Sequence, residues 1–381
     1  MMELVVVQLT DMHITGEDDL DILISRVGSI VGAISEVIKK PEETLLLICV
    51  TGDIANAGTK EQYDVAELFF EDMSEKIKDR YSDELWFHFV FIPGNHDCDF
   101  SNELLNARNT LIKNKEININ DSGVMQICLS LQKNFFAFVD EMVKKDLCMP
   151  LNQKGILTEN ILSNEAVPNL SDWKIKLHCL NTAWCSQKKE KKDMHFDIPD
   201  CSEKEKNDIV ITLMHHSSNW FDWEGNTVWD RYHREYSDIV LVGHDHKFNY
   251  VLEKNFDNST NYFVKGNQLY CKDEKEQSGF NILKVNLDDS IEIFYTYSWN
   301  NGVYVRSNDS EPRHFERNRY KDSSISIKPE MRDYLEEIEV EIVNKYKSPL
   351  CLSDVFVFPV LQEIMKNKLG STKTFREPKK Y

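Results

Sequence analysis

Short apolar runs alternate with amphipathic helical stretches in the first hundred residues, and this order constrains the fold more than any other feature. Apolar, largely β-branched or aromatic runs occur at 5–9, 45–50 and 87–92. Between them, 20–39 and 62–77 carry apolar residues at helical spacing. A strand–helix–strand–helix–strand order is typical of an α/β fold, in which helices connect the strands of one sheet.

Each apolar run ends in a polar loop, and two later runs, at 209–214 and 239–242, end in histidine-containing loops. Loops at the carboxyl ends of such strands converge on one edge of the sheet, where sites form. Aspartate, asparagine and imidazole suit Mn, Fe, Zn or Ni, and a bridging carboxylate can hold two such ions about 3.5–4 Å apart. The candidate residues in these loops are Asp11, His13, Asp53, Asn95, His96, Asp97, His215, His216, His244 and His246.

Five short blocks resemble the signature blocks of the calcineurin-like metallophosphoesterases. In chain order they are Asp11-Met12-His13, Gly52-Asp53, Gly94-Asn95-His96-Asp97, His215-His216 and Gly243-His244-Asp245-His246. The resemblance covers roughly residues 3–300 and implies a four-layer α/β/β/α sandwich. We therefore expect a catalytic domain over 1–306, with a helical insertion at about 101–172, and a C-terminal appendage or linker over 307–381.

The resemblance also implies a ligand set for two divalent ions. Asp11, His13 and His246 would bind the first ion, and Asn95, His215 and His244 the second. Asp53 would bridge both. Manganese is the expected metal, with Fe, Zn or Ni as alternatives.

The catalytic residues implied by the resemblance are Asp53 and His96. A metal-bridging hydroxide would attack phosphorus in line, and His96 would stabilise the phosphoryl charge or protonate the leaving oxygen. Asn95 and His216 are the expected substrate-binding residues. Asp97 either orients His96 or caps the following segment.

Several other segments near these blocks allow two interpretations. Gly243 would permit the turn that lets His244 and His246 point the same way. The tryptophans at 220, 223 and 229 either wall the site or pack a loop. We expect the charge-dense stretch 188–206 to be a solvated loop, and the long interval from Asp97 to His215 has room for a lid.

The block around Asn56 bears on the type of phosphoester. The phosphoprotein phosphatase branch has an aspartate at this position and an arginine after it, and both are missing here. The sequence therefore favours the phosphodiesterase and nuclease branches. The first hypothesis is hydrolysis of a cyclic nucleotide or other small nucleotide diester. The alternative is a DNA or RNA nuclease that acts as a defence or repair effector gated by a partner.

Composition bears on substrate and location. The formal net charge of −19 makes the chain a poor unaided binder of duplex DNA, which slightly favours a small substrate. The nine cysteines are scattered without a CxxC pair, and we find neither a membrane-spanning run nor a signal peptide. We therefore expect a cytoplasmic protein with reduced thiols and no membrane partner.

The C-terminal part lies outside the catalytic resemblance. The segment 348–361 resembles one found between effector domains and NTPase modules of bacterial antiviral STAND-type proteins. This implies an NTPase or sensor partner bound through 310–381. The other interpretation is a helix and strand packed on the catalytic domain. The basic tail at 366–381 would contact nucleic acid or form an exposed disordered end.

Overall fold

Two β-sheets form the centre of the structure, a computed structural model that describes residues 2–113, 117–167, 170–254, 260–270 and 278–317. The first sheet has the strand order β12-β11-β10-β1-β2-β3, with β13 paired to β11. Strands β1, β2 and β3 run parallel to one another, and β10 joins β1 antiparallel. Its strands are β1 (Glu3–Leu9), β2 (Thr44–Thr51), β3 (Trp86–Ile92), β10 (Gly279–Asn286), β11 (Ile291–Asn300), β12 (Val303–Asp309) and β13 (Arg313–His314).

The second sheet has the order β4-β5-β6-β7-β9-β8. Its four inner strands are parallel, and β4 and β8 pair antiparallel at the two edges. Its strands are β4 (Leu157–Leu162), β5 (Lys174–Leu180), β6 (Asp208–Met214), β7 (Ile239–Val242), β8 (Asn249–Lys254) and β9 (Thr260–Lys265).

Alternate residues of β1 face two different apolar layers, because side chains of a strand alternate between its faces. Val5 and Val7 belong to the apolar cluster that includes helices α1 (Leu20–Val37) and α2 (Lys60–Tyr81). Leu4 and Val6 belong to the cluster shared with β5, β6 and β7. The first sheet is therefore covered by helices on one face and by the second sheet on the other.

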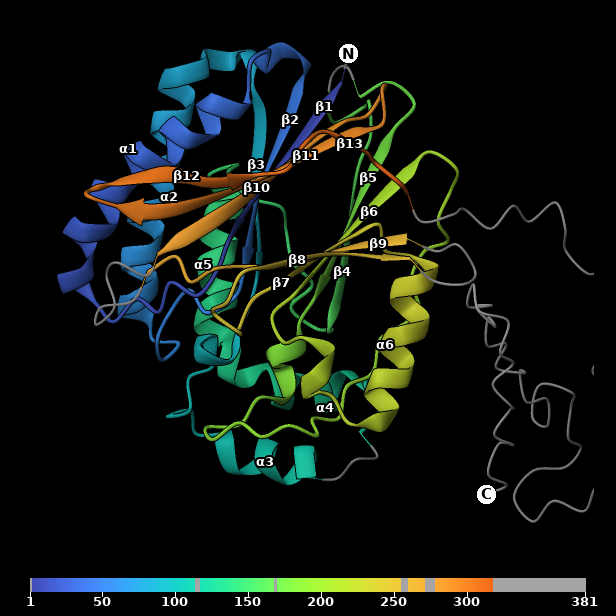
Figure 1. Cartoon of the computed structure of the whole chain (residues 1–381). Helices are drawn as coiled ribbons and strands as arrows, with labels where there is room; N and C mark the ends of the chain where they lie inside the picture. The colour runs from blue at the N-terminus through green and yellow to red at the C-terminus, as the bar shows by residue number, and fades with distance from the viewer. Residues whose placement is uncertain (1, 114–116, 168–169, 255–259, 271–277, 318–381) are drawn as a thin grey trace, which may run out of the picture. The chain divides into compact units, whose positions relative to one another are not determined.

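Helix α6 (Trp223–Glu235) completes the sandwich on the second sheet, opposite α1 and α2 (Figure 1). The Tyr232 hydroxyl of α6 lies 2.6 Å from Nδ1 of His178 on β5 and 3.4 Å from Oγ1 of Thr212 on β6. The expected α/β/β/α sandwich is confirmed.

The predicted helical insertion is helical only in its first part. Helices α3 (Leu105–Lys113), α4 (Ser122–Cys128) and α5 (Lys133–Lys144) lie there, and α5 packs on α2 through stacked rings of Tyr63 and Phe138. The prediction was wrong for 157–162, which forms strand β4. These six residues bury both end leucines and leave Glu159 and Ile161 exposed, as an edge strand does.

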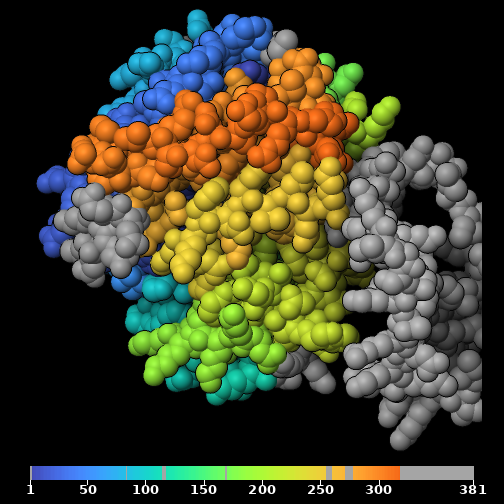
Figure 2. Space-filling view, in the orientation of Figure 1, coloured from blue at the N-terminus to red at the C-terminus, as the bar shows by residue number. Residues whose placement is uncertain are grey.

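The first sheet also continues beyond residue 306, where we expected the catalytic domain to end. Strand β12 runs to Asp309, and β13 pairs with Ile291 and Glu292 of β11. Figure 2 shows these strands beside β8 and β9 on the surface, and the rings of Tyr250 and Phe294 stack there at 4.3 Å. The predicted partner segment at 348–361 and the basic tail lie outside the described residues.

No helix in the described ranges is long and apolar enough to cross a bilayer. The seven cysteines that the structure describes are free thiols. Six of them are buried, so they contribute to packing rather than to a cross-linked scaffold.

The buried carboxyl of Glu292 predicts a pH dependence of stability. Glu292 is 1% exposed and accepts a hydrogen bond from Tyr250 Oη at 2.8 Å. Burial raises its pKa from 4.5 to about 7, so the folded protein holds this proton more tightly than the unfolded chain. The resulting stability is present below about pH 4.5 and is lost as the pH rises through about 7.

We expect Glu292→Gln to remove this loss, so that the variant is more stable than the parent at pH 8. Urea unfolding at pH 5 and pH 8 measures the difference, with the exposed Glu311→Gln as control. The same change in unfolding free energy with pH in parent and Glu292→Gln would contradict this assignment.

Candidate metal centre

The polar loops after β1, β2, β3, β6 and β7 meet at one edge of the two sheets. Backbone hydrogen bonds hold them together: Asp11 N donates to Gly52 O at 3.1 Å, and Gly243 N donates to His215 O at 3.2 Å. Because all five strands are parallel within their sheets, their carboxyl ends bring these loops to one place. The structure therefore brings all seven predicted ligands together.

Asp11, His13 and His246 form the first group. Nε2 of His246 lies 3.2 Å from Asp11 Oδ1 and 3.2 Å from Nε2 of His13. Asp11 Oδ2 accepts hydrogen bonds from Thr10 Oγ1 at 2.7 Å and His244 N at 3.2 Å. Its buried Oδ1 faces the ring nitrogen of His246, so a cation between these two atoms would be bound by both.

Asn95, His215 and His244 form the second group. Asn95 Oδ1 lies 2.9 Å from His215 Nε2 and 3.0 Å from His244 Nδ1, and these two nitrogens are 3.3 Å apart. The other ring nitrogen of His215, Nδ1, lies 2.8 Å from Thr51 O. A carbonyl oxygen only accepts, so Nδ1 carries a proton and Nε2 faces the group.

Asp53 lies between the two groups. Its Oδ2 is 3.3 Å from His215 Nε2 and 3.8 Å from His13 Nε2. Its Oδ1 accepts a hydrogen bond from His96 N at 2.8 Å, which fixes the plane of the carboxylate. This placement suits a carboxylate shared by two cations.

The donor set fits two divalent metal ions. The closest ligand atoms within each group are 2.9–3.3 Å apart. Ligands about 2.0–2.2 Å from one ion are separated by about 3.0–3.5 Å in octahedral or tetrahedral geometry. Nitrogen and oxygen atoms that face one another so closely need a shared cation, or a proton, to offset their repulsion.

Five of the seven ligands have a left-handed backbone, which L-residues adopt at a cost. The φ angles are 54° for Asp11, 45° for His13, 54° for Asp53, 70° for His244 and 53° for His246. We expected Gly243 to make the turn that lets His244 and His246 point the same way, and this prediction was wrong. His244 and His246 make the turn themselves, and Gly243 is required because a Cβ there would lie 2.5 Å from Thr10 Oγ1 and Thr51 O.

Burial lowers the pKa values of His215 and His244, whereas the nearby Asp53 carboxylate raises them. Burial alone would lower the pKa of His215, but the adjacent Asp53 raises it to about 10. Burial and the nearby His215 lower the pKa of His244 to about 3. Without a metal the group therefore holds its proton on His215, and a metal ion bound by His215 would compete with that proton.

The His96 ring is oriented by a backbone carbonyl rather than by Asp97. Its Nδ1 lies 2.8 Å from Asn56 O, so Nδ1 donates and Nε2 is left for other partners. Asp97 is buried and accepts hydrogen bonds from Gly94 N at 2.8 Å, Ala55 N at 2.9 Å and Tyr63 Oη at 2.8 Å. It therefore joins the loops after β2 and β3 and closes its own turn.

His216 does not offer a free nitrogen to a substrate. The ring is fully buried, with Nδ1 3.0 Å from Thr182 Oγ1 and Nε2 3.2 Å from Glu190 Oε1. The geometry does not support the substrate-binding role predicted for His216 and indicates a packing role beside His215.

Sequence analysis missed Glu190, which lies in the stretch expected to be a solvated loop. Its side chain is 12% exposed, and its Oε2 lies 3.7 Å from His244 Nε2. Because His244 turns its Nδ1 toward the metal ligands, Glu190 faces the opposite side of the ring. A lone acid among lysines gives no sequence signal of such a role.

The three tryptophans have three different environments. Trp220 contacts His244 edge-on, with 4.4 Å between ring centroids, and so walls the second group. Trp229 is 2% exposed and stacks on His233, whereas Trp223 is 78% exposed. Both interpretations of this cluster therefore apply, each to a different residue.

The sequence profile of the calcineurin-like phosphoesterases matches residues 4–248, and the chain belongs to this family. The family is one of metal-dependent phosphoesterases that normally bind two divalent ions. No curated protein matches the sequence significantly.

Solved structures with a similar fold come from several eukaryotes. Vps29 from Cryptosporidium parvum is 12% identical over 82% of this chain and 100% of its own, with a TM-score of 0.31. GAP50 from Plasmodium is 12% identical over 84% and 91%, with a TM-score of 0.42. The purple acid phosphatase PPD1 from yellow lupin is 12% identical over 81% and 53%, with a TM-score of 0.44.

The close approach of two loops predicts that Gly94→Ala prevents normal metal binding. A Cβ at Gly94 would overlap Asp53 Oδ1 and N, so the carboxylate between the two groups must move. We expect fewer than two ions per folded chain, measured by elemental analysis after dialysis against Mn²⁺. Gly28→Ala is the control, since a Cβ there meets nothing within 4 Å. Two bound ions per folded chain in Gly94→Ala would show that the loops can move apart without loss of metal binding.

Glu190 predicts a change in metal affinity. Carboxylates that face the outer nitrogen of a ligand histidine fix its orientation, and their loss typically weakens metal binding about 10–100-fold. We expect Glu190→Gln to weaken Mn²⁺ binding by about tenfold or more at one of the two sites, measured by calorimetric titration. The exposed Glu224→Gln is the matched control. Equal affinities in Glu190→Gln and the control would exclude this role.

Proposed function

We propose that this metallophosphoesterase hydrolyses phosphodiesters. The observation that supports a diester is a groove of about 530 Å³ beside the metal centre, lined by His96 and Asn95 together with Asn56, Phe100 and Lys188. A monoester ends at its phosphate, whereas a diester carries a second substituent that needs such a space. Asn56 also stands where the phosphoprotein phosphatases have an aspartate.

His96 is the residue best placed to assist the leaving group. The groove extends past its ring, and Asn56 O holds Nδ1, so a proton on Nε2 can pass to an oxygen that leaves into the groove. The two divalent ions supply Lewis acidity and lower the pKa of water when bound. Asp53 and the histidines of the two groups would hold those ions.

Two substrate classes fit this proposal. A cyclic or other small nucleotide diester agrees with the net charge of −19. A nucleic-acid strand, cleaved by a nuclease gated through a partner at 310–381, is the alternative. The specific observation in its favour is the group of lysines at the mouth of the site, described below.

We expect the Mn²⁺-loaded protein to cleave bis-p-nitrophenyl phosphate faster than p-nitrophenyl phosphate, and Asp53→Asn to lose this activity at least 1,000-fold (~4 kcal/mol). Release of p-nitrophenol measures both. Cyclic nucleotides, DNA and RNA in the same assay identify the natural class. Faster hydrolysis of the monoester would overturn the diester proposal, and activity retained in Asp53→Asn would exclude the two-metal mechanism.

A leaving-group series tests His96. If its Nε2 protonates the leaving oxygen, His96→Ala lowers kcat/KM about 10²–10⁴-fold for esters of poor leaving groups, and much less for p-nitrophenyl esters. Methyl and p-nitrophenyl esters of thymidine 5′-phosphate give the comparison. An equal loss for both esters would show that His96 stabilises charge and does not transfer a proton.

A further inference from the structure

Residues 186–194 cross the mouth of the metal centre between the short helix Thr182–Cys185 and strand β6, and we call them the lysine strap. Their sequence is Ser-Gln-Lys-Lys-Glu-Lys-Lys-Asp-Met. The four lysines, 188, 189, 191 and 192, are exposed, while Glu190 between them points inward. The inward orientation of Glu190 distinguishes the strap from a solvated loop, whose charged side chains all face the solvent.

Contacts inside the protein hold the strap at two points. Glu190 Oε1 accepts a hydrogen bond from His216 Nε2 at 3.2 Å, which ties the middle of the strap to the loop after β6. Met194 N donates to Trp220 O at 2.9 Å, and Asp222 N donates to Met194 O at 2.7 Å. The lysines between these anchors are therefore held beside the metal ligands.

Two of the lysines lie close to residues of the metal centre. Lys188 lines the groove that contains His96. Lys192 Nζ lies 5.8 Å from the ring of Trp220, and that ring contacts His244 of the second ligand group. In the described part of the chain, none of the four ammonium groups has a carboxylate within 4.0 Å.

Aromatic rings accompany both positions. Phe100 lines the groove with Lys188, and Trp220 lies beneath Lys192. Two acids, Glu190 and Asp99, also line the groove, and Asp99 accepts hydrogen bonds from Ser101 N and Oγ at 2.9 and 2.6 Å. Proteins that bind single-stranded nucleic acid combine basic side chains, which contact phosphates, with aromatic rings, on which bases stack.

A diester with only one phosphate offers no second anionic group to cations outside the metal centre. A polynucleotide does, because further phosphates flank the one that is cleaved. In a chain with a net charge of −19, four exposed lysines at this position are a local reversal of sign. Such a patch attracts a polyanion that the rest of the surface repels.

We propose that the lysine strap binds the phosphates that flank the scissile one, so that the substrate of this site is a single-stranded polynucleotide. This inference rests on the proposed phosphodiesterase function. It assigns one flanking phosphate to Lys188, beside His96, and another to Lys192, beside Trp220.

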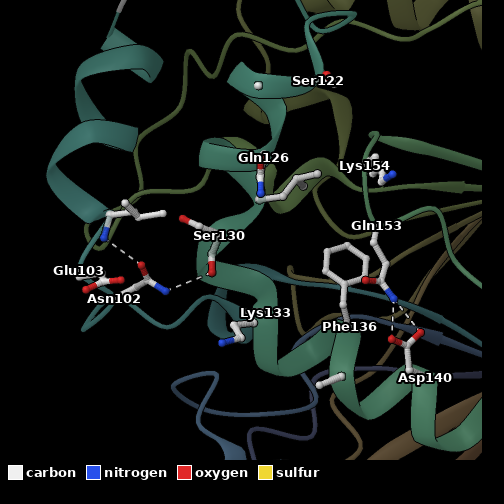
Figure 3. Close-up of a pocket in the computed structure, with 14 residues that line it drawn as sticks. Asn102, Glu103, Ser122, Gln126, Ser130, Lys133, Phe136, Asp140, Gln153 and Lys154 are labelled. Carbon is white, nitrogen blue, oxygen red and sulfur yellow. Dashed lines mark hydrogen bonds between the residues drawn. The ribbon is translucent and has the colours of Figure 1, made fainter.

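The test compares two double variants of the full chain. Lys188→Ala/Lys192→Ala alters the strap, and the control Lys133→Ala/Lys154→Ala alters two lysines that line a separate hollow of about 860 Å³ in the helical insertion (Figure 3). Each protein is assayed on a single-stranded 12-mer and on bis-p-nitrophenyl phosphate. We expect the strap variant to lose at least tenfold more kcat/KM on the 12-mer than on the small diester, mainly through KM. The control loses nothing on either substrate.

The salt dependence of polynucleotide binding is a second measurement. It would not change if the strap lysines had only a structural role. Each phosphate neutralised on a single strand contributes about 0.7 to the slope of log affinity against log salt. The strap variant should therefore lower this slope by about 1.4, and Lys188→Arg/Lys192→Arg should restore it. In the parent protein, kcat/KM should rise from a dinucleotide to the 12-mer.

The outcomes separate this inference from the proposed function. Cleavage of bis-p-nitrophenyl phosphate with equal losses on both substrates, or with no loss in the strap variant, overturns the inference and leaves the phosphodiesterase intact. If neither substrate is cleaved, the proposed function fails. Anisotropy of a labelled 12-mer on His96→Ala protein then decides the strap's role: binding that depends on Lys188 and Lys192 supports it, and binding that does not overturns it.

Discussion

The Asp53 carboxylate, buried between two groups of nitrogen and oxygen ligands, is the constraint on which the rest of the site depends. One oxygen is held by His96 N, and the other faces His215 and His13. A buried carboxylate of this kind is stable only when cations or protons lie against it. The loops after β1, β3 and β6 meet this requirement, because they place His13, His96 N and His215 beside the Asp53 carboxylate.

The backbone bears part of the cost of this convergence. Asp11, His13 and Asp53 have positive φ angles, and Gly94 must lack a side chain to pass beside Asp53. Non-glycine residues keep such conformations only where the surroundings impose them. Here the sheets on one side and the cross-loop hydrogen bonds on the other impose them, and the bound ions would add to both.

Around this fixed centre, the surrounding segments differ in what they contribute. The loop after β3 presents His96 to a groove, and Asn56 O sets the tautomer of the ring. The lysine strap adds positive charge above the centre and is tied down through Glu190. The protein thus combines a candidate metal centre of the kind its family normally has with a strap that we propose to contact the substrate.

The sequence by itself predicted the α/β layering, because strand periodicity is a local feature, and its resemblance to the family predicted the sandwich and the candidate ligands that the structure brings together. It also placed 105–144 in helices. It did not reveal strand β4, the roles of Asp97 and His216, the turn made by His244 and His246 themselves, or the inward orientation of Glu190. Each of these was decided by contacts between segments far apart in the chain. Whether a charged side chain is solvated or buried depends on what packs against it, and only the tertiary structure supplies that neighbour.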